Sequence, residues 1–156
     1  MKRLLTLFAV IFLAMAAGGL VLAQSNPFVG TWKLNLAKSK FNPGPAPKSQ
    51  TRTWAVDGKV SAKGLNPTGK PVAYGYPVMG DGKHYPTTGA VPNSADTISS
   101  KRIDANTIEA NFSRGGKPSD TTRFVVSKNR KVLTIAAKGT LPDGKLLDDL
   151  LVLDKQ

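Results

Sequence analysis

The sequence contains no cysteine and a single histidine, His84, among its 156 residues. The absence of cysteine excludes disulfide bonds, a thiol nucleophile, a lipid-modified cysteine and a zinc site built on thiolates. A single histidine also excludes a metal centre built from several imidazoles. We therefore predict no metal site.

Acidic residues are scarce as well, because 10 Asp and Glu stand against 22 Lys and Arg, which gives a formal net charge of +12. The hydrophobic content of 40% is nevertheless enough for a packed core, and the length suits one ordinary domain. A basic surface attracts anions such as lipid head groups and anionic polymers. Nucleic acid is disfavoured as a partner, because nucleic-acid modules interleave basic residues with stacking aromatics and only 7% of this chain is aromatic.

Residues 1–23 have the organisation of a secretory signal peptide. Lys2 and Arg3 form a positive start, the following residues up to Ala23 carry no charge, and Val-Leu-Ala places small residues where signal peptidase cleaves. We expect residues 24–156 to form the mature domain, secreted or periplasmic. A retained membrane anchor is the alternative, because an uncharged stretch of this length could also span a bilayer. No later stretch is long and apolar enough for that.

The remaining chain consists of short runs that alternate apolar and polar residues between turn signals, which is typical of β-strands. An Asp-Gly pair at 57–58 predicts a tight hairpin. The last run also fits a helical stripe of leucines, but the short turn before it favours a strand. The expected strands are residues 28–36, 50–56, 59–65, 72–78, 97–103, 107–114, 120–126, 132–139 and 145–154.

Two stretches are expected to be loops. Residues 42–47 are rich in proline, which cannot pair in a central strand. Residues 64–95 contain several prolines and glycines, and only 72–78 within them alternates like a strand. Long loops in compact domains often carry function, so loops 42–48 and 66–95 are expected to surround any binding site.

The predicted fold class is all-β. An antiparallel meander of about 8–10 strands leaves two exposed edges, and closure into a barrel removes them. A barrel of eight strands is wide enough to be filled by side chains or to hold one small ligand.

Residues 28–34, Phe-Val-Gly-Thr-Trp-Lys-Leu, resemble the first strand of the lipocalins and fatty-acid-binding proteins, the calycin group. The resemblance implies that Gly30 and Trp32 form a barrel-closing motif, on which Lys155 is available to stack. The chain is also similar to secreted bacterial lipocalin-like proteins of unassigned function. They share its Gly-Thr-Trp-Lys-Leu-Asn opening, its Pro-Gly-Pro-Ala-Pro loop and its Asp-Lys-Gln ending.

The same resemblance has an exception at the last strand. Fatty-acid-binding proteins carry there an Arg-x-Tyr pair that contacts the ligand carboxylate. Residues 150–154, Leu-Leu-Val-Leu-Asp, contain neither arginine nor tyrosine. The resemblance therefore implies no carboxylate site on that strand.

An interior ligand would meet apolar residues and a few polar anchors. Arginine binds anionic head groups well, and Arg52 shares a predicted strand face with Trp54. Arg102 and Arg114 are similar candidates, or else lie at strand ends and extend into water. Small residues on inward faces (Gly30, Ala62, Gly64, Ala110, Ala137 and Gly139) would leave room for the ligand. The candidate ligand-binding residues are Trp32, Arg52, Trp54, Tyr74, Tyr76, Arg102, Phe112 and Arg114.

No catalytic arrangement is found in the sequence. No serine occupies a Gly-x-Ser-x-Gly elbow, and His84 is expected in an exposed turn. Asp57, Asp104 and Asp143 lie in turn signals, where the carboxylate bonds the local backbone. Neither a Gly-rich phosphate loop nor a dinucleotide fingerprint is present. We predict a non-catalytic protein without a cofactor.

Two functions remain open at this point. The first is extracytoplasmic binding of a small, mainly apolar or amphiphilic ligand inside the barrel. The alternative is an interaction protein with a filled barrel, whose basic surface docks to anionic envelope polymers or lipid head groups. Surface docking weakens steeply with salt, whereas burial of an apolar ligand hardly responds to it.

Overall fold

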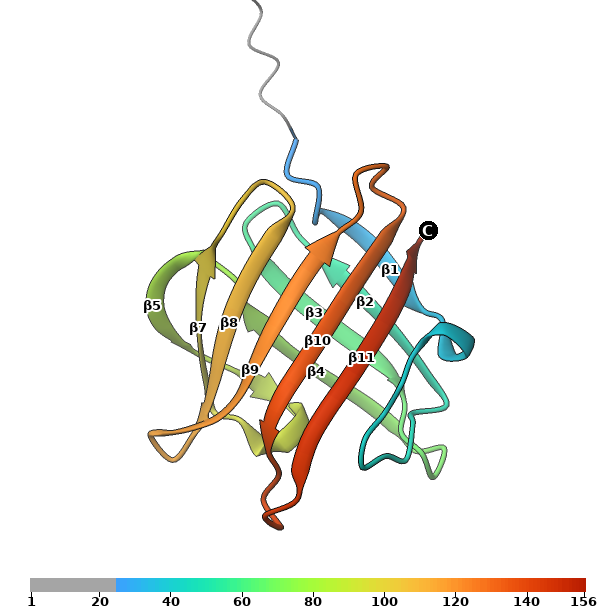
Figure 1. Cartoon of the computed structure of the whole chain (residues 1–156), viewed down its shortest axis with the longest axis vertical. Helices are drawn as coiled ribbons and strands as arrows, with labels where there is room; N and C mark the ends of the chain where they lie inside the picture. Colours follow the sequence, from blue (N-terminus) through green and yellow to red (C-terminus); the bar gives the residue numbers. More distant parts are fainter. Residues whose placement is uncertain (1–24) are drawn as a thin grey trace, which may run out of the picture.

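The computed structural model describes residues 25–156, so the expected signal peptide lies outside the described residues. Its strands form a single antiparallel 11-stranded sheet that curls into a nearly closed barrel, which confirms the predicted all-β class (Figure 1). The strands are β1 (Gly30–Leu34), β2 (Ser49–Trp54), β3 (Lys59–Leu65), β4 (Pro71–Pro77), β5 (Asp81–Pro86), β6 (Thr88–Gly89), β7 (Thr97–Arg102), β8 (Thr107–Arg114), β9 (Lys117–Val126), β10 (Val132–Thr140) and β11 (Leu146–Lys155).

The first and last long strands close the barrel on one side. Sequential neighbours pair from β1 to β4 and from β7 to β11, and β1 pairs antiparallel with β11. In that seam Trp32 lies opposite Lys155, and Leu34 lies opposite Leu153. The sheet order ends at β5 and β6, where the remaining gap in the barrel lies. The last run is therefore a strand, as its preceding turn predicted.

The hairpin between β2 and β3 shows how local sequence sets the strands. The Ala55 amide bonds the Lys59 carbonyl at 2.8 Å, and Gly58 has a φ of +83°, a value that L side chains rarely adopt. Along β2, Arg52 and Trp54 are buried while Thr53 is exposed. The strand ends at Trp54, two residues before the prediction, because Val56 lies in the turn and is 87% exposed.

The region 64–95 has more regular structure than predicted. Besides β4 it contains β5 and β6, where the sequence indicated only loop. Strand β5 pairs with β7 through contacts such as Tyr85 opposite Ile98, with an irregularity before His84. His84 therefore lies exposed on an edge strand rather than in a turn. Pro86 ends β5, and proline is tolerated on such edges.

A second correction concerns the small inward residues. A Cβ at Gly139 would overlap the backbone carbonyl of Ser119, and a Cβ at Gly64 would overlap the carbonyl of Ser49. These glycines allow neighbouring strands to approach closely, and neither of them is part of the cavity lining described below. Ala137, by contrast, does line the interior space described below.

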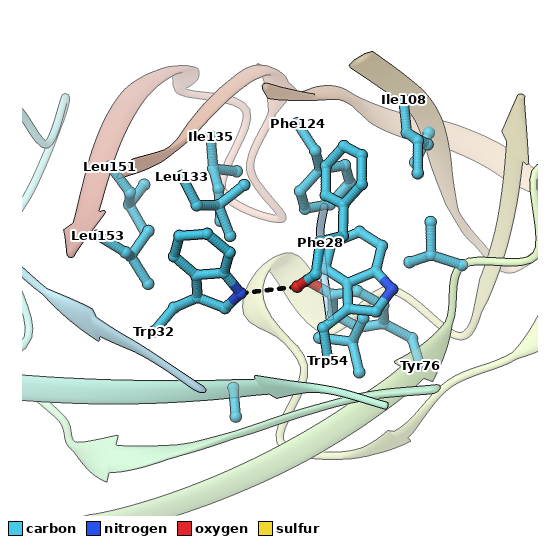
Figure 2. Close-up of a cluster of buried hydrophobic side chains, with 14 of the residues drawn as sticks. Phe28, Trp32, Trp54, Tyr76, Ile108, Phe124, Leu133, Ile135, Leu151 and Leu153 are labelled. Carbon is cyan, nitrogen blue, oxygen red and sulfur yellow. Dashed lines mark hydrogen bonds between the residues drawn. The ribbon is translucent and has the colours of Figure 1, made fainter. Parts of the chain in front are cut away.

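The packed core fills one end of the barrel. Its centre is the aromatic floor, which we define as Phe28, Trp32, Trp54 and Phe124 (Figure 2). Trp54 lies 4.7 Å from Phe28 and edge-on to Phe124 at 5.4 Å, measured between ring centroids. The Trp32 indole donates a hydrogen bond of 2.8 Å to the Phe28 carbonyl.

Apart from the strands there are only two short 3-10 helices in residues 25–156, at Leu36–Lys38 and Pro92–Ser94. None of the helices in this part of the chain has the length and apolar run needed to cross a bilayer.

Candidate ligand-binding cavity

A cavity of about 370 Å³ lies inside the barrel and opens at one end. Its rim consists of the proline-rich loop after Phe41, the β3–β4 turn, the segment 90–93 and the start of β11, which lie at the lower end in Figure 1. Its apolar wall is contributed mainly by Val72, Phe112, Ile135 and Leu151.

Four polar side chains meet on one wall, and we call them the Arg52 cluster: Gln50, Arg52, Tyr74 and Tyr76. Arg52 is 4% exposed. Its Nη1 donates to the Tyr76 hydroxyl, and its Nη2 donates to the Tyr74 hydroxyl and to Gln50 Oε1, both at 3.2 Å. Gln50 Nε2 donates to the Tyr74 hydroxyl at 2.9 Å.

The sheet register brings this cluster together. Gln50 and Arg52 are two residues apart on β2, and Tyr74 and Tyr76 are two apart on β4, so each pair shares one face of its strand. Strand β3 lies between them, with Ala62 opposite both Arg52 and Tyr74. Because Ala62 has only a methyl group, the guanidinium can reach across β3 to the two hydroxyls.

Two groups of the cluster, Tyr76 and Arg52, have raised pKa values. Burial raises the pKa of Tyr76 to about 12, in spite of the opposing effect of Arg52. Burial also works against the charge on Arg52, but Tyr76 and Tyr74 outweigh it, and the pKa of the guanidinium is raised. This part of the cavity wall therefore carries the positive charge of Arg52 and the neutral hydroxyl of Tyr76 at neutral pH.

No carboxylate within residues 25–156 forms an ion pair with this guanidinium. The ion pairs of this part of the chain are exposed ones, made by Lys59, Arg123, Lys138 and Lys145. Among the same residues, Arg52 Nε is buried and has no hydrogen-bond partner. The hydrogen-bond partners of Arg52 are thus tyrosine and glutamine groups, and the Asp120 carboxylate, which also lines the cavity, acts on the cluster only through its charge, which helps to raise the pKa of Tyr76.

A second polar group on the cavity wall is centred on Asp120 of β9. Its carboxylate accepts hydrogen bonds from Ser119 Oγ at 2.9 Å, Asn93 Nδ2 at 3.2 Å and Thr122 Oγ1 at 3.3 Å. Asp149 lies at the rim, where it accepts from the Asn42 amide at 2.8 Å. Burial, together with the neighbouring Asp148, raises the pKa of Asp149 despite this hydrogen bond.

The predicted ligand-binding residues do not all meet. Arg52, Tyr74, Tyr76 and Phe112 line the cavity, and Tyr76 packs edge-on to Phe112 at 5.2 Å. Trp32 and Trp54 lie in the aromatic floor, outside the cavity lining. Contact of any of these residues with a ligand stays a prediction.

The other two arginines lie elsewhere. Arg102 is exposed, lies 5.4 Å from the Phe28 ring and donates to the Ala105 carbonyl. Arg114 donates to the Asn93 carbonyl at 2.7 Å. The pairing of β8 with β9 is irregular between Phe112 and Ser113, and Arg114 is not part of the cavity lining.

Sequence reasoning missed Gln50, Asp120 and Thr122 as cavity residues. A signal for each was present. Gln50 precedes Arg52 by two residues, and Asp120 and Thr122 are in phase with the buried Phe124 of the same strand.

The Gly30–Trp32 motif has a definite geometry at the closed end. Lys155 Nζ lies 4.9 Å from the centroid of the Trp32 ring and donates to the Val29 carbonyl at 2.9 Å. Gly30 has a φ of +136°, and a Cβ there would lie 2.8 Å from Lys155 Cε. Gly30 therefore leaves the space that the lysine needs to cover the indole.

A separate, more open groove of about 500 Å³ lies at the closed end. Its basic lining is Arg102, Lys128 and Arg130, from the turns at the upper end of Figure 1. Arg130 donates to Ser25 Oγ at 2.9 Å.

Within residues 25–156, no three His, Asp or Glu side chains gather as metal ligands.

Comparisons with known proteins show a likeness to solved structures. No family model matches the chain, and no curated protein matches it. Among solved structures, the zebrafish ileal bile acid-binding protein, crystallised with cholic acid, is similar with a TM-score of 0.49 and 10% sequence identity. The match covers 83% of this chain and 99% of that one.

Proposed function

We propose that this protein is a non-catalytic, extracytoplasmic binding protein that holds a small, mainly apolar ligand in its barrel. The observation that carries the proposal is the cavity of about 370 Å³, which has apolar walls and two polar groups, the Arg52 cluster and the group around Asp120. This volume lies near the lower end of the range for small-molecule sites, roughly 300–1,000 Å³. Burial of apolar ligand surface would supply the affinity, at about 25 cal/mol per Å².

The proline-rich rim supports a binding site that is preformed. Pro45, Pro47, Pro67 and Pro92 line it, and the proline ring fixes φ. Such a rim has little backbone freedom to lose when a ligand enters, which lowers the entropic cost of binding. The packed aromatic floor holds the opposite end of the cavity in place.

The extracytoplasmic location rests on residues 1–23 alone. Their positive start, uncharged middle and Val-Leu-Ala end support secretion, and the ligand would then be one that is met in the periplasm or the medium.

The first test is native mass spectrometry of the mature protein purified from a periplasmic extract. We expect a bound mass that is lost on denaturation and can be identified in the organic extract. The purified protein should also enhance the fluorescence of the neutral apolar probe N-phenyl-1-naphthylamine. A bare protein mass together with no probe binding would overturn the proposal.

A matched pair of variants links binding to the cavity. Ala137 lines the cavity, whereas its neighbour Ala136 is not part of the lining and, by alternation, faces the other side of β10. Ala137→Phe should abolish probe binding by filling the space, and Ala136→Phe should leave it unchanged. Equal binding by both variants would place the probe outside the barrel.

The alternative function keeps one observation in its favour, the basic groove of Arg102, Lys128 and Arg130. Such a groove suits docking to an anionic envelope polymer or to lipid head groups. The filled barrel that this alternative assumed is not what the structure has, because the cavity is present. The two functions are therefore compatible. They can be distinguished by salt, because docking to the groove should weaken as salt rises and ligand binding in the cavity should hardly change.

A further inference from the structure

The Arg52 cluster has more hydrogen-bond donors than acceptors. Its acceptors are the two tyrosine oxygens and Gln50 Oε1, and Arg52 already donates to all three. Neither the Tyr74 nor the Tyr76 hydroxyl proton has an acceptor within residues 25–156. Buried donors of this kind are normally satisfied, so the cluster lacks an acceptor group.

The cluster also lacks a negative charge. A buried guanidinium without a carboxylate partner is unfavourable, and Arg52 has none among residues 25–156. Water could satisfy the donors, but only an anion supplies both the acceptor oxygens and the opposite charge. Charge-assisted hydrogen bonds from guanidinium and phenol to an oxyanion are among the stronger ones.

The other charged groups facing the cavity restrict where that anion can lie. Asp120 already accepts from Ser119, Asn93 and Thr122, and Asp149 lies at the rim. Both carboxylates disfavour a second negative charge nearby. These carboxylates therefore favour an anion of single charge, placed against β2 and β4.

This inference rests on the proposed function, the binding of a ligand in the cavity. On that basis the arrangement of the Arg52 cluster indicates a specific class of ligand. We propose that the Arg52 cluster binds the oxyanion head group of a small monoanionic amphiphile, a carboxylate or a sulfonate. Arg52 supplies the charge, and the Tyr74 and Tyr76 hydroxyls donate their free protons to the head group. The apolar body of the ligand packs on Phe112, Ile135 and Leu151.

The test compares octanoate with 1-octanol, which share an apolar chain and differ in the charge of the head group. Affinities are measured by displacement of N-phenyl-1-naphthylamine, a neutral probe. We expect the wild-type protein to bind octanoate at least about tenfold more tightly than octanol, the scale of one charge-assisted hydrogen bond. Octanesulfonate should behave like octanoate.

Variants locate the preference. Arg52→Gln should reduce the octanoate-to-octanol ratio to about one and leave octanol binding intact. Tyr74→Phe and Tyr76→Phe keep the aromatic rings, so we expect both variants to fold, and they provide the test in case Arg52→Gln does not fold. Each should weaken octanoate binding several-fold. Arg102→Gln removes an arginine outside the cavity and should change neither affinity.

The outcomes separate this inference from the proposed function. Equal binding of octanoate and octanol by the wild-type protein would overturn the head-group site and leave the apolar cavity intact. A preference that survives in both tyrosine variants and in a folded Arg52→Gln would also overturn it. Failure of the probe to bind, together with a bare protein mass in native mass spectrometry, would remove the proposed function itself.

Discussion

At the scale of single residues, the two tryptophans of the aromatic floor are equally buried but differ in their hydrogen bonding. Trp32 donates its indole N–H to the Phe28 carbonyl, whereas Trp54 Nε1 has no partner among residues 25–156. Removing one partner of a buried hydrogen bond leaves the other partner unsatisfied, which lowers the free energy of unfolding by about 1–3 kcal/mol. Removing an unpaired N–H has no such cost.

We therefore expect Trp32→Phe to reduce the free energy of unfolding by about 2 kcal/mol more than Trp54→Phe, because only the former leaves the Phe28 carbonyl unpaired. Urea unfolding followed by circular dichroism measures both variants, and each serves as the control for the other. Equal losses would show that ring packing alone decides the contribution of these residues.

Because of Tyr76, we expect the free energy of unfolding to depend on pH in the alkaline range. Its pKa is raised to about 12, chiefly by burial, whereas an unfolded tyrosine ionises near ~10. As the pH rises from about 10 to 12, the unfolded state loses this proton and the folded state keeps it. The free energy of unfolding should fall over that range by on the order of 2 kcal/mol.

The measurement is an absorbance titration of tyrosine ionisation, combined with urea unfolding at several pH values between 9 and 12 (roughly the span of the shift). Tyr76→Phe should lose the last ionisation step and most of the destabilisation. If the variant and the wild-type protein titrate alike, Tyr76 is not the shifted group.

At the scale of the strands, curvature depends on close approach at particular glycines. Gly139 of β10 lies against the Ser119 carbonyl and Asp120 of β9, with no space for a Cβ. Gly139→Ala should destabilise the fold by about 2 kcal/mol or more, because β9 must move away. Lys138→Ala, at the exposed neighbouring position, should cost at most about 0.5 kcal/mol.

Thermal unfolding of Gly139→Ala and Lys138→Ala measures these two losses of stability. Binding of the apolar probe N-phenyl-1-naphthylamine is a second measurement on the same variants. Because Asp120 and Ala137 both line the cavity beside Gly139, the alanine variant should also bind the probe more weakly. A stable Gly139→Ala variant with normal binding would mean that this strand crossing is not tightly constrained.

At the scale of the whole molecule, the two ends of the barrel differ in chemistry. One end opens into the cavity, and the other carries the basic groove. Retention on an anionic glycan column should fall steeply with salt, whereas binding of octanol in the cavity should hardly change. The same protein should thus show two binding modes, of which only one is sensitive to ionic strength.

Charge variants assign the retention to a face of the molecule. Replacing Arg102 and Arg130 by glutamine should lower the salt concentration needed for elution. Replacing Lys63 and Lys70, two exposed lysines away from the groove, changes the net charge equally and should have a smaller effect. Equal shifts would indicate a response to net charge rather than to the groove.

Much of the element pattern could be predicted from the chain itself, because period-two alternation and turn chemistry act over a few residues. The hairpin at Asp57-Gly58 and the strand character of the last run follow from such local signals. Strand β5 could not be predicted, because its Asp-Gly-Lys-His-Tyr-Pro sequence has no apolar alternation. It is a strand because the free edge of β7 offers backbone partners.

The candidate site shows the same division. Sequence alone determined an all-β chain, its basic charge, the apolar faces of its strands and the placing of Arg52 on a buried face. Only the tertiary structure decided which polar residues meet, because register is a long-range property. It set Ala62 between Arg52 and Tyr74, and it left Arg114 outside the cavity lining. A cavity depends on how far the strands curve, and that depends on contacts between residues distant in the chain.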